Sequence, residues 1–476
     1  MADVIEESTE RPGEERTELK RVMGPGLLLL FIVGDILGTG IYALTGQVAA
    51  EIGGAVWLPF LVAFVVAIIT AFSYLELVTK YPRAAGAALY THKAFGIHFF
   101  TFMVCFTVMS SGITSASTAS RAFAANLFAG FNVDMEPTAT GVTLVALGFM
   151  ALVALVNFRG VGESVKANVV LTCIELSGLL IIILIGLYAL GFGEADFSVA
   201  AEIKPSEGQS VFVAITAATS LAFFAMVGFE DSVNMAEETK DPVRTFPKIM
   251  LIGLCLTGGI YVLVSITAVA LVPLDELSEG DTPLLKVVEA GAPGLALDAV
   301  FPFIAMFAVA NSALINMLMA SRLLYGMARE EVLPPVLGRV HPGRRTPWVA
   351  IVFTTLLSVG LITVVGNVPD LGGTTALLLL GVFTVVNVAV LVLRKDDVGH
   401  EHFRAPTVLP VVGAIACAYL VTPLSGRDVA QYKIAGVLLV IGVVLWAITW
   451  FTNRAIRAKK TFLRDPEQLS GGGPVN

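Results

Sequence analysis

The chain has 476 residues, of which 56% are hydrophobic and only 14% are charged, and its formal net charge is −8. This composition excludes a soluble globular protein of ordinary make-up. Runs of about 20 apolar residues recur from end to end, and the in-and-out alternation of a membrane β-barrel is absent. The sequence therefore predicts an all-α polytopic membrane protein.

Two tails flank the apolar region. Residues 1–23 mix acidic and basic side chains without an apolar stretch, so we expect a disordered tail and not a cleavable signal peptide. A transmembrane domain is predicted over 24–452, followed by a second tail at 453–476. The twelve predicted spans are 24–50, 54–79, 94–125, 139–157, 167–191, 209–236, 246–272, 294–327, 346–366, 371–394, 405–423 and 432–452.

Positive charge is distributed unevenly between the two sides of these spans. If the N-terminus is cytoplasmic, nearly all lysines and arginines fall in cytoplasmic loops and tails, in agreement with the positive-inside rule. The exceptions are Arg121, Lys204, Lys286, Arg427 and Lys433. We therefore predict a multi-pass protein of the plasma membrane with both termini in the cytoplasm.

The first span contains the segment GDILGTGIYALT, residues 34–45. Three glycines and Asp35 in one short stretch weaken a lipid-facing helix, so the segment predicts two half-helices joined by exposed backbone. Such a break offers N–H groups to a carboxylate and carbonyls to an ammonium group, which is the chemistry of an α-amino acid. The alternative is a glycine-kinked packing helix.

The sixth span shows a similar interruption, because Gly228 is followed closely by Glu230 and Asp231. Two broken spans of opposite orientation, five spans apart, are what an inverted repeat of five plus five helices produces. The sequence therefore predicts a binding site between broken spans 1 and 6, near the middle of the membrane.

Four blocks of sequence identify a family resemblance: IVGDILGTGIYALTG (32–46), SYLELVTKYPRAAGAALY (73–90), FFAMVGFEDSVNMAEETKDPVRTFPKIM (223–250) and SRLLYGMARE (321–330). With these blocks in order across twelve spans, the chain resembles the amino acid–polyamine–organocation (APC) superfamily of permeases, in its cationic-amino-acid-transporter-like branch. The resemblance covers roughly residues 24–460 and implies the leucine-transporter-type fold.

The resemblance also implies where the substrate binds. N–H groups of the segment Gly38, Thr39, Gly40 and Ile41 would take its carboxylate, and carbonyls of Ile36, Leu37, Phe224, Ala225 and Val227 would take its ammonium group. Phe224 stands where such transporters keep an aromatic lid. As a bare motif, a pair of phenylalanines in a membrane helix is more often core packing.

The third span supplies small polar residues near mid-membrane, which are Ser110, Ser111, Thr114 and Ser115. They suit a neutral ligand, although they are equally ordinary helix-packing residues. No acid in this span stands out to select a cationic side chain. We therefore expect a neutral or broad specificity, with a polyamine or other amine as the alternative substrate.

Acidic residues inside the spans are candidates for ion coupling, because a carboxylate in the membrane is expensive unless it has a function. Asp35, Glu175 and Glu230 are the predicted coupling residues, and the alternative for each is a structural hydrogen bond. Two of them depart from the family pattern, since relatives often have a small or amide residue in place of Asp35 and a lysine in place of Glu175. We expect protons to drive transport, with sodium, bound near Asn311 and Ser312, as the less favoured ion.

Charged residues at cytoplasmic span ends are candidates for an inner gate. These are Glu76 and Lys80 after the second span, and Glu237 and Lys240 after the sixth. Interfacial anchoring is the alternative for each.

The function predicted from these features is a proton-coupled secondary active transporter of amino acids that works by alternating access. No metalloprotease, Walker or nucleophile-elbow motif is found, so neither an enzyme nor an ATP-driven pump is expected. The predicted partners are an amino acid, a proton and the lipid bilayer, with no cofactor, metal or nucleic acid. The alternatives are an uncoupled exchanger, a channel and an amino acid sensor.

Overall fold

The structure is a computed structural model that describes residues 23–455, except 84–85, 134–139, 160–163, 193–194, 206–207, 294, 330–331 and 345. The two predicted tails lie almost entirely outside these residues. Within them, ten helical segments are long and apolar enough to cross a membrane, and two shorter apolar helices, Trp348–Val364 and Val408–Val421, accompany them. These twelve segments correspond to the twelve predicted spans, which confirms the all-α polytopic fold.

Two of the spans are interrupted, as predicted. The spans in chain order are α1 (Pro25–Ile36) with α2 (Thr39–Ile52), α3 (Trp57–Lys80), α5 (His98–Gly130), α6 (Thr140–Arg159), α7 (Ser164–Phe192), α8 (Val211–Ala222) with the 3₁₀ turns η2 (Phe223–Met226) and η3 (Asp231–Met235), α9 (Pro242–Leu271), α12 (Phe301–Arg329), α13 (Trp348–Val364), α14 (Val368–Leu393), α15 (Val408–Val421) and α16 (Val429–Ala455).

Short helices fill the connections between spans. They are α4 (Gly86–Phe95), η1 (Phe197–Ala201), α10 (Leu274–Ser278), α11 (Pro283–Gly291), η4 (Pro335–Gly338) and η5 (Pro423–Ser425). Span boundaries differ from the prediction by a few residues where local backbone intervenes. Gly96 has φ +64, which separates α4 from α5, so the third span begins at His98 and not at residue 94.

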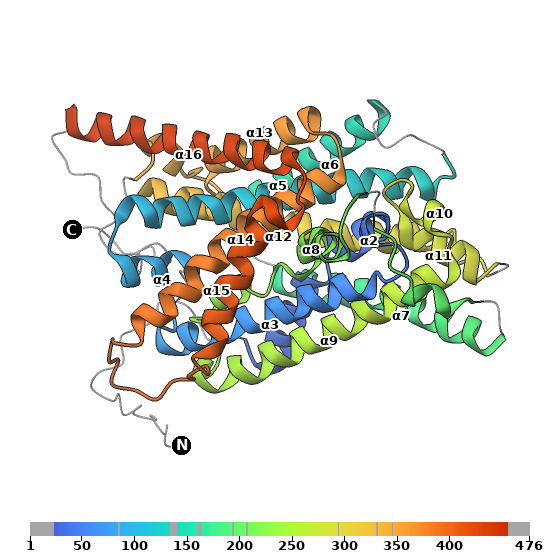
Figure 1. Ribbon diagram of the computed structural model, residues 1–476. Helices are drawn as coiled ribbons and strands as arrows, with labels where there is room; N and C mark the ends of the chain where they lie inside the picture. The colour runs from blue at the N-terminus through green and yellow to red at the C-terminus, as the bar shows by residue number, and fades with distance from the viewer. Residues whose placement is uncertain are drawn as a thin grey trace, which may run out of the picture.

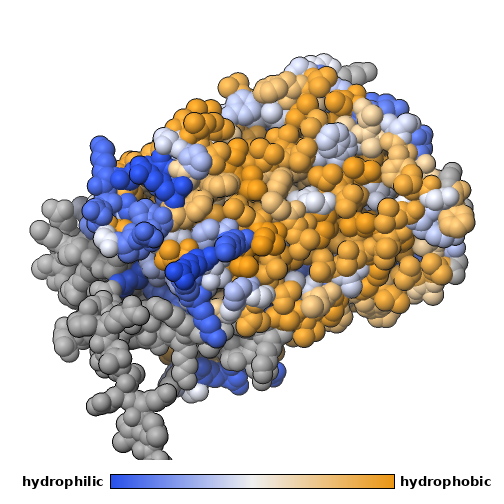
Figure 2. Space-filling model, turned by 90° about the horizontal axis from the view of Figure 1, so that it is seen from below, coloured by the Kyte–Doolittle hydropathy of each residue, from blue (hydrophilic) through white to orange (hydrophobic). Residues whose placement is uncertain are grey.

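Many of the spans, among them α3, α5, α9 and α16, run roughly along one direction, which is horizontal in Figure 1, whereas α14 and α15 slope across it. α4 and the connection between α14 and α15 lie at the left end of that view, called here the α4 end. The hairpin of α10 and α11 lies at the opposite end. Figure 2 shows a broad apolar surface between more polar ends, and most of the exposed large side chains on α6, α7 and α16 are apolar. This is the surface that a bilayer covers.

The interior is built around the interrupted spans. α1 packs against α7 and α9, and α2 packs against α8, while α5 lies along α12 and α14. Residues 31–46 of the first span are all buried. The interrupted backbone therefore sits inside a shell of intact helices, where its polar groups are shielded from lipid.

Candidate substrate-binding site

The first span is interrupted at Leu37 and Gly38. Gly38 precedes α2 with φ −53 and ψ −148, and it provides no side chain to cap the first turn of that helix. The N–H groups at the start of α2 therefore lack the partner that a serine or aspartate cap would supply. A helix start of this kind attracts a negatively charged group.

The sixth span is interrupted more extensively than the first. Val227 is extended, with φ −73 and ψ 143, and Gly228 has φ +126, which an L side chain rarely adopts. The sequence predicted an interrupted helix here, and after the break the chain continues as the 3₁₀ turn η3 and further turns up to α9. Glu230 explains part of this geometry, because its Oε2 accepts a 2.9 Å hydrogen bond from the Gly228 N–H.

The two interruptions contact each other through backbone. A Cβ placed on Gly228 would lie 2.7 Å from the carbonyl oxygen of Asp35, and one placed on Gly40 would lie 2.4 Å from Cα of Ala225. No side chain fits at either point without movement of main chain. The glycines that break the helices therefore also allow the two spans to meet.

A small cavity lies at this meeting point. Its volume is about 20 Å³, which is roughly the room that one water molecule needs. The residues that line it come from α1 and α2, α5, the interrupted sixth span and α12: Asp35, Ile36, Gly38, Thr39, Gly40, Ser115, Phe224, Val227, Gly228, Asp231, Ser312 and Asn316.

Polar groups without a hydrogen-bond partner among the described residues gather around this cavity. They include Oδ2 of Asp35 and the hydroxyl oxygens of Thr39 and Ser312, all three buried. Buried polar groups are normally hydrogen-bonded, so their concentration on one cavity makes this cavity the candidate site for a polar ligand. The carbonyl of Ile36 already accepts a 2.6 Å hydrogen bond from Tyr261 Oη, which leaves its second lone pair.

Most of the predicted substrate residues line the cavity, but not all of them do. Leu37 and Ile41 are fully buried outside its lining, and so is Ala225, whose backbone contacts Gly40. From α5 it is Ser115 that lines the cavity. Thr114 makes a 2.7 Å hydrogen bond with Thr375, and Ser110 is buried away from the lining.

Glu175 lies on α7, outside the cavity lining. Both of its carboxylate oxygens are buried without a hydrogen-bond partner in the described part of the chain, as are Thr172 Oγ1 and Asn311 Nδ2. Its main-chain carbonyl accepts a 2.7 Å hydrogen bond from Tyr42 Oη on α2. Thr172 presses against α1, because a Cβ on Gly34 would lie 1.8 Å from its hydroxyl oxygen.

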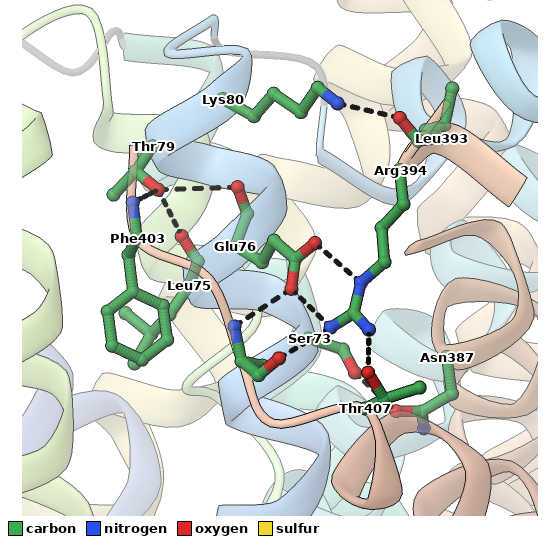
Figure 3. A network of polar contacts seen from close by, with 11 residues as sticks. Ser73, Leu75, Glu76, Thr79, Lys80, Asn387, Leu393, Arg394, Phe403 and Thr407 are labelled. Carbon is green, nitrogen blue, oxygen red and sulfur yellow. Dashed lines mark hydrogen bonds and ion pairs between the residues drawn. The ribbon is translucent and has the colours of Figure 1, made fainter. Parts of the chain in front are cut away.

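The predicted gate residues Glu76 and Lys80 belong to a polar network at the α4 end (Figure 3). The Glu76 carboxylate accepts hydrogen bonds from Arg394 Nε at 2.9 Å and Nη2 at 2.8 Å, and from the N–H of Ala405 at 2.9 Å. Lys80 donates to the carbonyl of Leu393 at 2.6 Å. This network joins α3 to the end of α14 and to the segment that follows it.

The other two gate candidates lie elsewhere. The side chain of Lys240 is exposed, and its N–H donates to the carbonyl of Met23 at 2.9 Å. Glu237, like Lys240, follows η3 and is partly exposed. The partner that the sequence did not reveal is Arg394, which is separated from Glu76 by more than 300 residues of chain.

Several lining residues were not among the predicted substrate ligands. Asp231, Ser115, Gly228, Ser312 and Asn316 all line the cavity. The signal for Ser312 is the predicted sodium site near Asn311 and Ser312, and Asn316 lies one helical turn beyond Ser312 on α12. For Asp231 the sequence placed an acid near the break but did not show which way it points.

The chain is similar to known membrane transporters. A family model described as amino acid permease matches residues 27–445. The methylthioribose transporter of Bacillus subtilis is 27% identical over 86% of this chain and 89% of its own length. The branched-chain amino acid permease BcaP of the same organism is 24% identical over 90% and 92%. Cationic amino acid transporter 9 of Arabidopsis thaliana is 28% identical over 68% of this chain and 58% of its own length.

Proposed function

The chain belongs to the amino acid permease family of membrane transporters, which confirms the APC assignment, and we propose that it is a secondary active transporter that carries amino acids across the plasma membrane together with protons. The observation that carries this proposal is the buried polar cavity at the point where the two interrupted spans meet. Lysine and arginine at the α4 end, including Lys80 at the end of α3 and Arg394 at the end of α14, support a cytoplasmic location of that end, and we assign both termini to the cytoplasm as well.

The cavity provides complementary groups for both charges of an amino acid. The substrate carboxylate binds the N–H groups at the start of α2, near Thr39 and Gly40, and the hydroxyl of Thr39. The ammonium group binds carbonyls of the broken segments, such as those of Ile36 and Val227, and an oxygen of the Asp35 carboxyl group, which accepts a hydrogen bond in the protonated state as well. Phe224 covers the ligand on one side and excludes water from these contacts.

The size of the cavity supports transport by alternating access. A space of about 20 Å³ does not admit an amino acid, so the interrupted spans must separate before a substrate enters or leaves. Contacts of main chain with main chain, such as Gly40 with Ala225, are replaced by ligand when the cavity opens. The Glu76–Arg394 network closes the α4 end, and its opening belongs to the inward-facing step. Glu237 and Lys240 are weaker gate candidates.

Coupling to protons is assigned to Asp35, Glu175 and Glu230. Asp35 lines the cavity, so opening toward either side exposes its carboxyl group to that side's proton concentration. Glu175 is buried on α7 beside the first span, and Glu230 binds the Gly228 N–H at the second break. Movement of the broken spans changes the surroundings of all three carboxyl groups, which links proton binding to the transport step.

A cationic amino acid or a polyamine is the second candidate substrate. Two carboxylates, Asp35 and Asp231, line the cavity, whereas the sequence led us to expect a neutral side chain. One of them is available for a positively charged side chain when the other binds the α-ammonium group.

Binding by the purified protein tests the assignment of the substrate site. The panel consists of neutral amino acids, cationic amino acids, their methyl esters and a polyamine, each competing with a labelled amino acid that binds. We expect free amino acids to compete and their esters to fail, because an ester cannot satisfy the helix N–H groups as a carboxylate does. If esters and polyamines compete as well as free acids, the ligand is an amine. That result would contradict the binding of a substrate carboxylate at the start of α2.

A further inference from the structure

The turn between α15 and α16 docks closely on α8, the first half of the interrupted sixth span. Thr216 of α8 donates a 3.1 Å hydrogen bond to the carbonyl of Ser425. Gly426 has φ +85, and a Cβ on it would lie 2.9 Å from Val213 and 3.0 Å from Ala217, both on α8. Only glycine allows this turn and α8 to approach so closely.

Arg427, the next residue, is a buried cation that joins four helices. Its guanidinium donates to the carbonyls of Leu420 on α15 at 2.7 Å, Gly373 on α14 at 2.9 Å and Ser220 on α8 at 3.3 Å. It also donates to Oε1 of Gln431 on α16 at 2.9 Å. Burial lowers the pKa of this guanidinium to about 10, so it remains charged at neutral pH.

Two of these acceptors lie in the last turn of a helix. α8 ends at Ala222 and α15 ends at Val421, so Ser220 and Leu420 present carbonyls at the negative ends of two helix dipoles. A cation at that position stabilises both helix ends. The planar, forked guanidinium can reach all of its acceptors at once, which a lysine ammonium cannot do with the same geometry.

The Arg427 contacts are directly connected to the cavity. Gly373, which accepts from Arg427, follows Gly372, and a Cβ on Gly372 would lie 3.2 Å from the ring of Phe224. Phe224 lies in η2, immediately after α8, and lines the cavity. Arg427 therefore joins α8 to α14 through the carbonyls of Ser220 and Gly373. The neighbouring residue of α14, Gly372, contacts Phe224.

We propose that Arg427 is a positioning residue of the transport cycle: it holds α8 against α14 and thereby keeps Phe224 closed over the substrate cavity. Opening of the cavity past Phe224 requires that its ring leaves Gly372, which separates η2 from α14. That separation breaks the bond of Arg427 to either Ser220 or Gly373. The inference rests on the proposed transport function for its meaning, but the contact that it concerns is independent of the substrate.

Thiol labelling without substrate tests this proposal. Leu44 of α2 is 1% exposed and contacts the same Gly372, so a cysteine in its place reports the opening of the contact between α2, α14 and Phe224. The background carries Cys173→Ser and Cys255→Ser, because these two native cysteines are exposed. The reagent is a water-soluble, membrane-impermeant methanethiosulfonate, applied to purified protein in liposomes.

The Leu44→Cys reporter should react at least tenfold faster when Arg427→Gln is added, and to an intermediate degree with Arg427→Lys, which retains the charge and only part of the bonds. The matched control is Lys433→Gln on α16, an exposed cation six residues away, which should leave the rate unchanged. In uptake assays, Arg427→Gln should raise KM several-fold more than it lowers the maximal rate, because the closed state around the substrate is weakened.

Equal labelling rates in the wild type and Arg427→Gln would overturn the proposal. If Arg427→Gln fails to fold, Arg427→Lys decides the question: a wild-type labelling rate in that variant also overturns it. A loss of maximal rate with unchanged KM and unchanged labelling would assign Arg427 to folding alone. Because labelling needs no substrate, a failure of the amino acid assignment leaves this result intact.

Discussion

Replacement of Glu76 by glutamine tests the network at the α4 end. The side chains of Glu76 and Arg394 are 2% and 11% exposed, and the carboxylate accepts two bonds from the guanidinium and one from the N–H of Ala405. Removing one partner of a buried pair costs about 3–5 kcal/mol of unfolding free energy. Arg394 would keep the carbonyl of Ala405 and the hydroxyl of Thr407 as acceptors. We therefore expect Glu76→Gln to cost about 3 kcal/mol, at the lower end of that range.

Arg394→Met should cost more, about 4–5 kcal/mol, because it leaves a nearly inaccessible carboxylate with a single N–H donor. The double variant should cost about 2–3 kcal/mol less than the sum of the two, since it removes both charges. The assay is unfolding of the purified protein in mixed micelles by titration with a denaturing detergent. Glu202→Gln, which removes an exposed ion pair with Lys204, is the control and should cost less than about 1 kcal/mol.

Additive effects in the double variant would refute the reasoning, because they would mean that Glu76 and Arg394 do not interact in the folded protein. A cost as small as that of Glu202→Gln would do the same, since it would place the pair in water. Either result would also remove the Glu76 network as a closure of the α4 end.

Three further changes test other parts of the structure. Gly228→Ala should abolish substrate binding in a protein that still inserts into the membrane, because φ +126 and a 2.7 Å approach to Asp35 exclude a Cβ; wild-type affinity would contradict this. Phe224→Ala should lower the initial rate of uptake more than it lowers equilibrium binding, and equal losses would assign the ring to packing alone. Burial raises the pKa of Asp281 to about 6 against the opposing effect of Arg121. The folded protein thus binds this proton more tightly than the unfolded chain, and about 3 kcal/mol of stability present below about pH 4 is lost as the pH rises through 6. Asp281→Asn should therefore abolish the corresponding fall in thermal midpoint, and an unchanged pH profile would disprove it.

Much of the fold could be predicted because the signals are local. Apolar runs give the spans, and glycines within a few residues of an acidic side chain give the breaks at Gly38 and Gly228. The second half of the sixth span could not be predicted as 3₁₀ and turn structure, because its irregular backbone depends on the Glu230 bond to Gly228 and on contact with the first span. An apolar run carries no information about such tertiary contacts.

Side-chain direction limited the prediction of the site. Ser110, Thr114 and Ser115 are equivalent candidates in the sequence, and the packing of α5 against α12 and α14 decides that Ser115 lines the cavity. The partners of Glu76 and the contacts of Arg427 join segments that are distant in the chain. Neither follows from spacing, since residues far apart in sequence carry no periodic signal of their contact.

Uptake by the purified protein in liposomes tests the central claim most directly. Labelled amino acids are supplied outside, and a pH gradient, acidic outside, or a sodium gradient at constant pH is imposed separately. The account predicts concentrative uptake with the pH gradient and none with the sodium gradient. It also predicts that Asp35→Asn and Glu175→Gln lose this accumulation but still exchange bound substrate, while Glu202→Gln accumulates normally. Uptake driven by sodium alone would contradict proton coupling and move the ion site to Asn311 and Ser312. If neither gradient drove accumulation of any amino acid, secondary active transport itself would be contradicted.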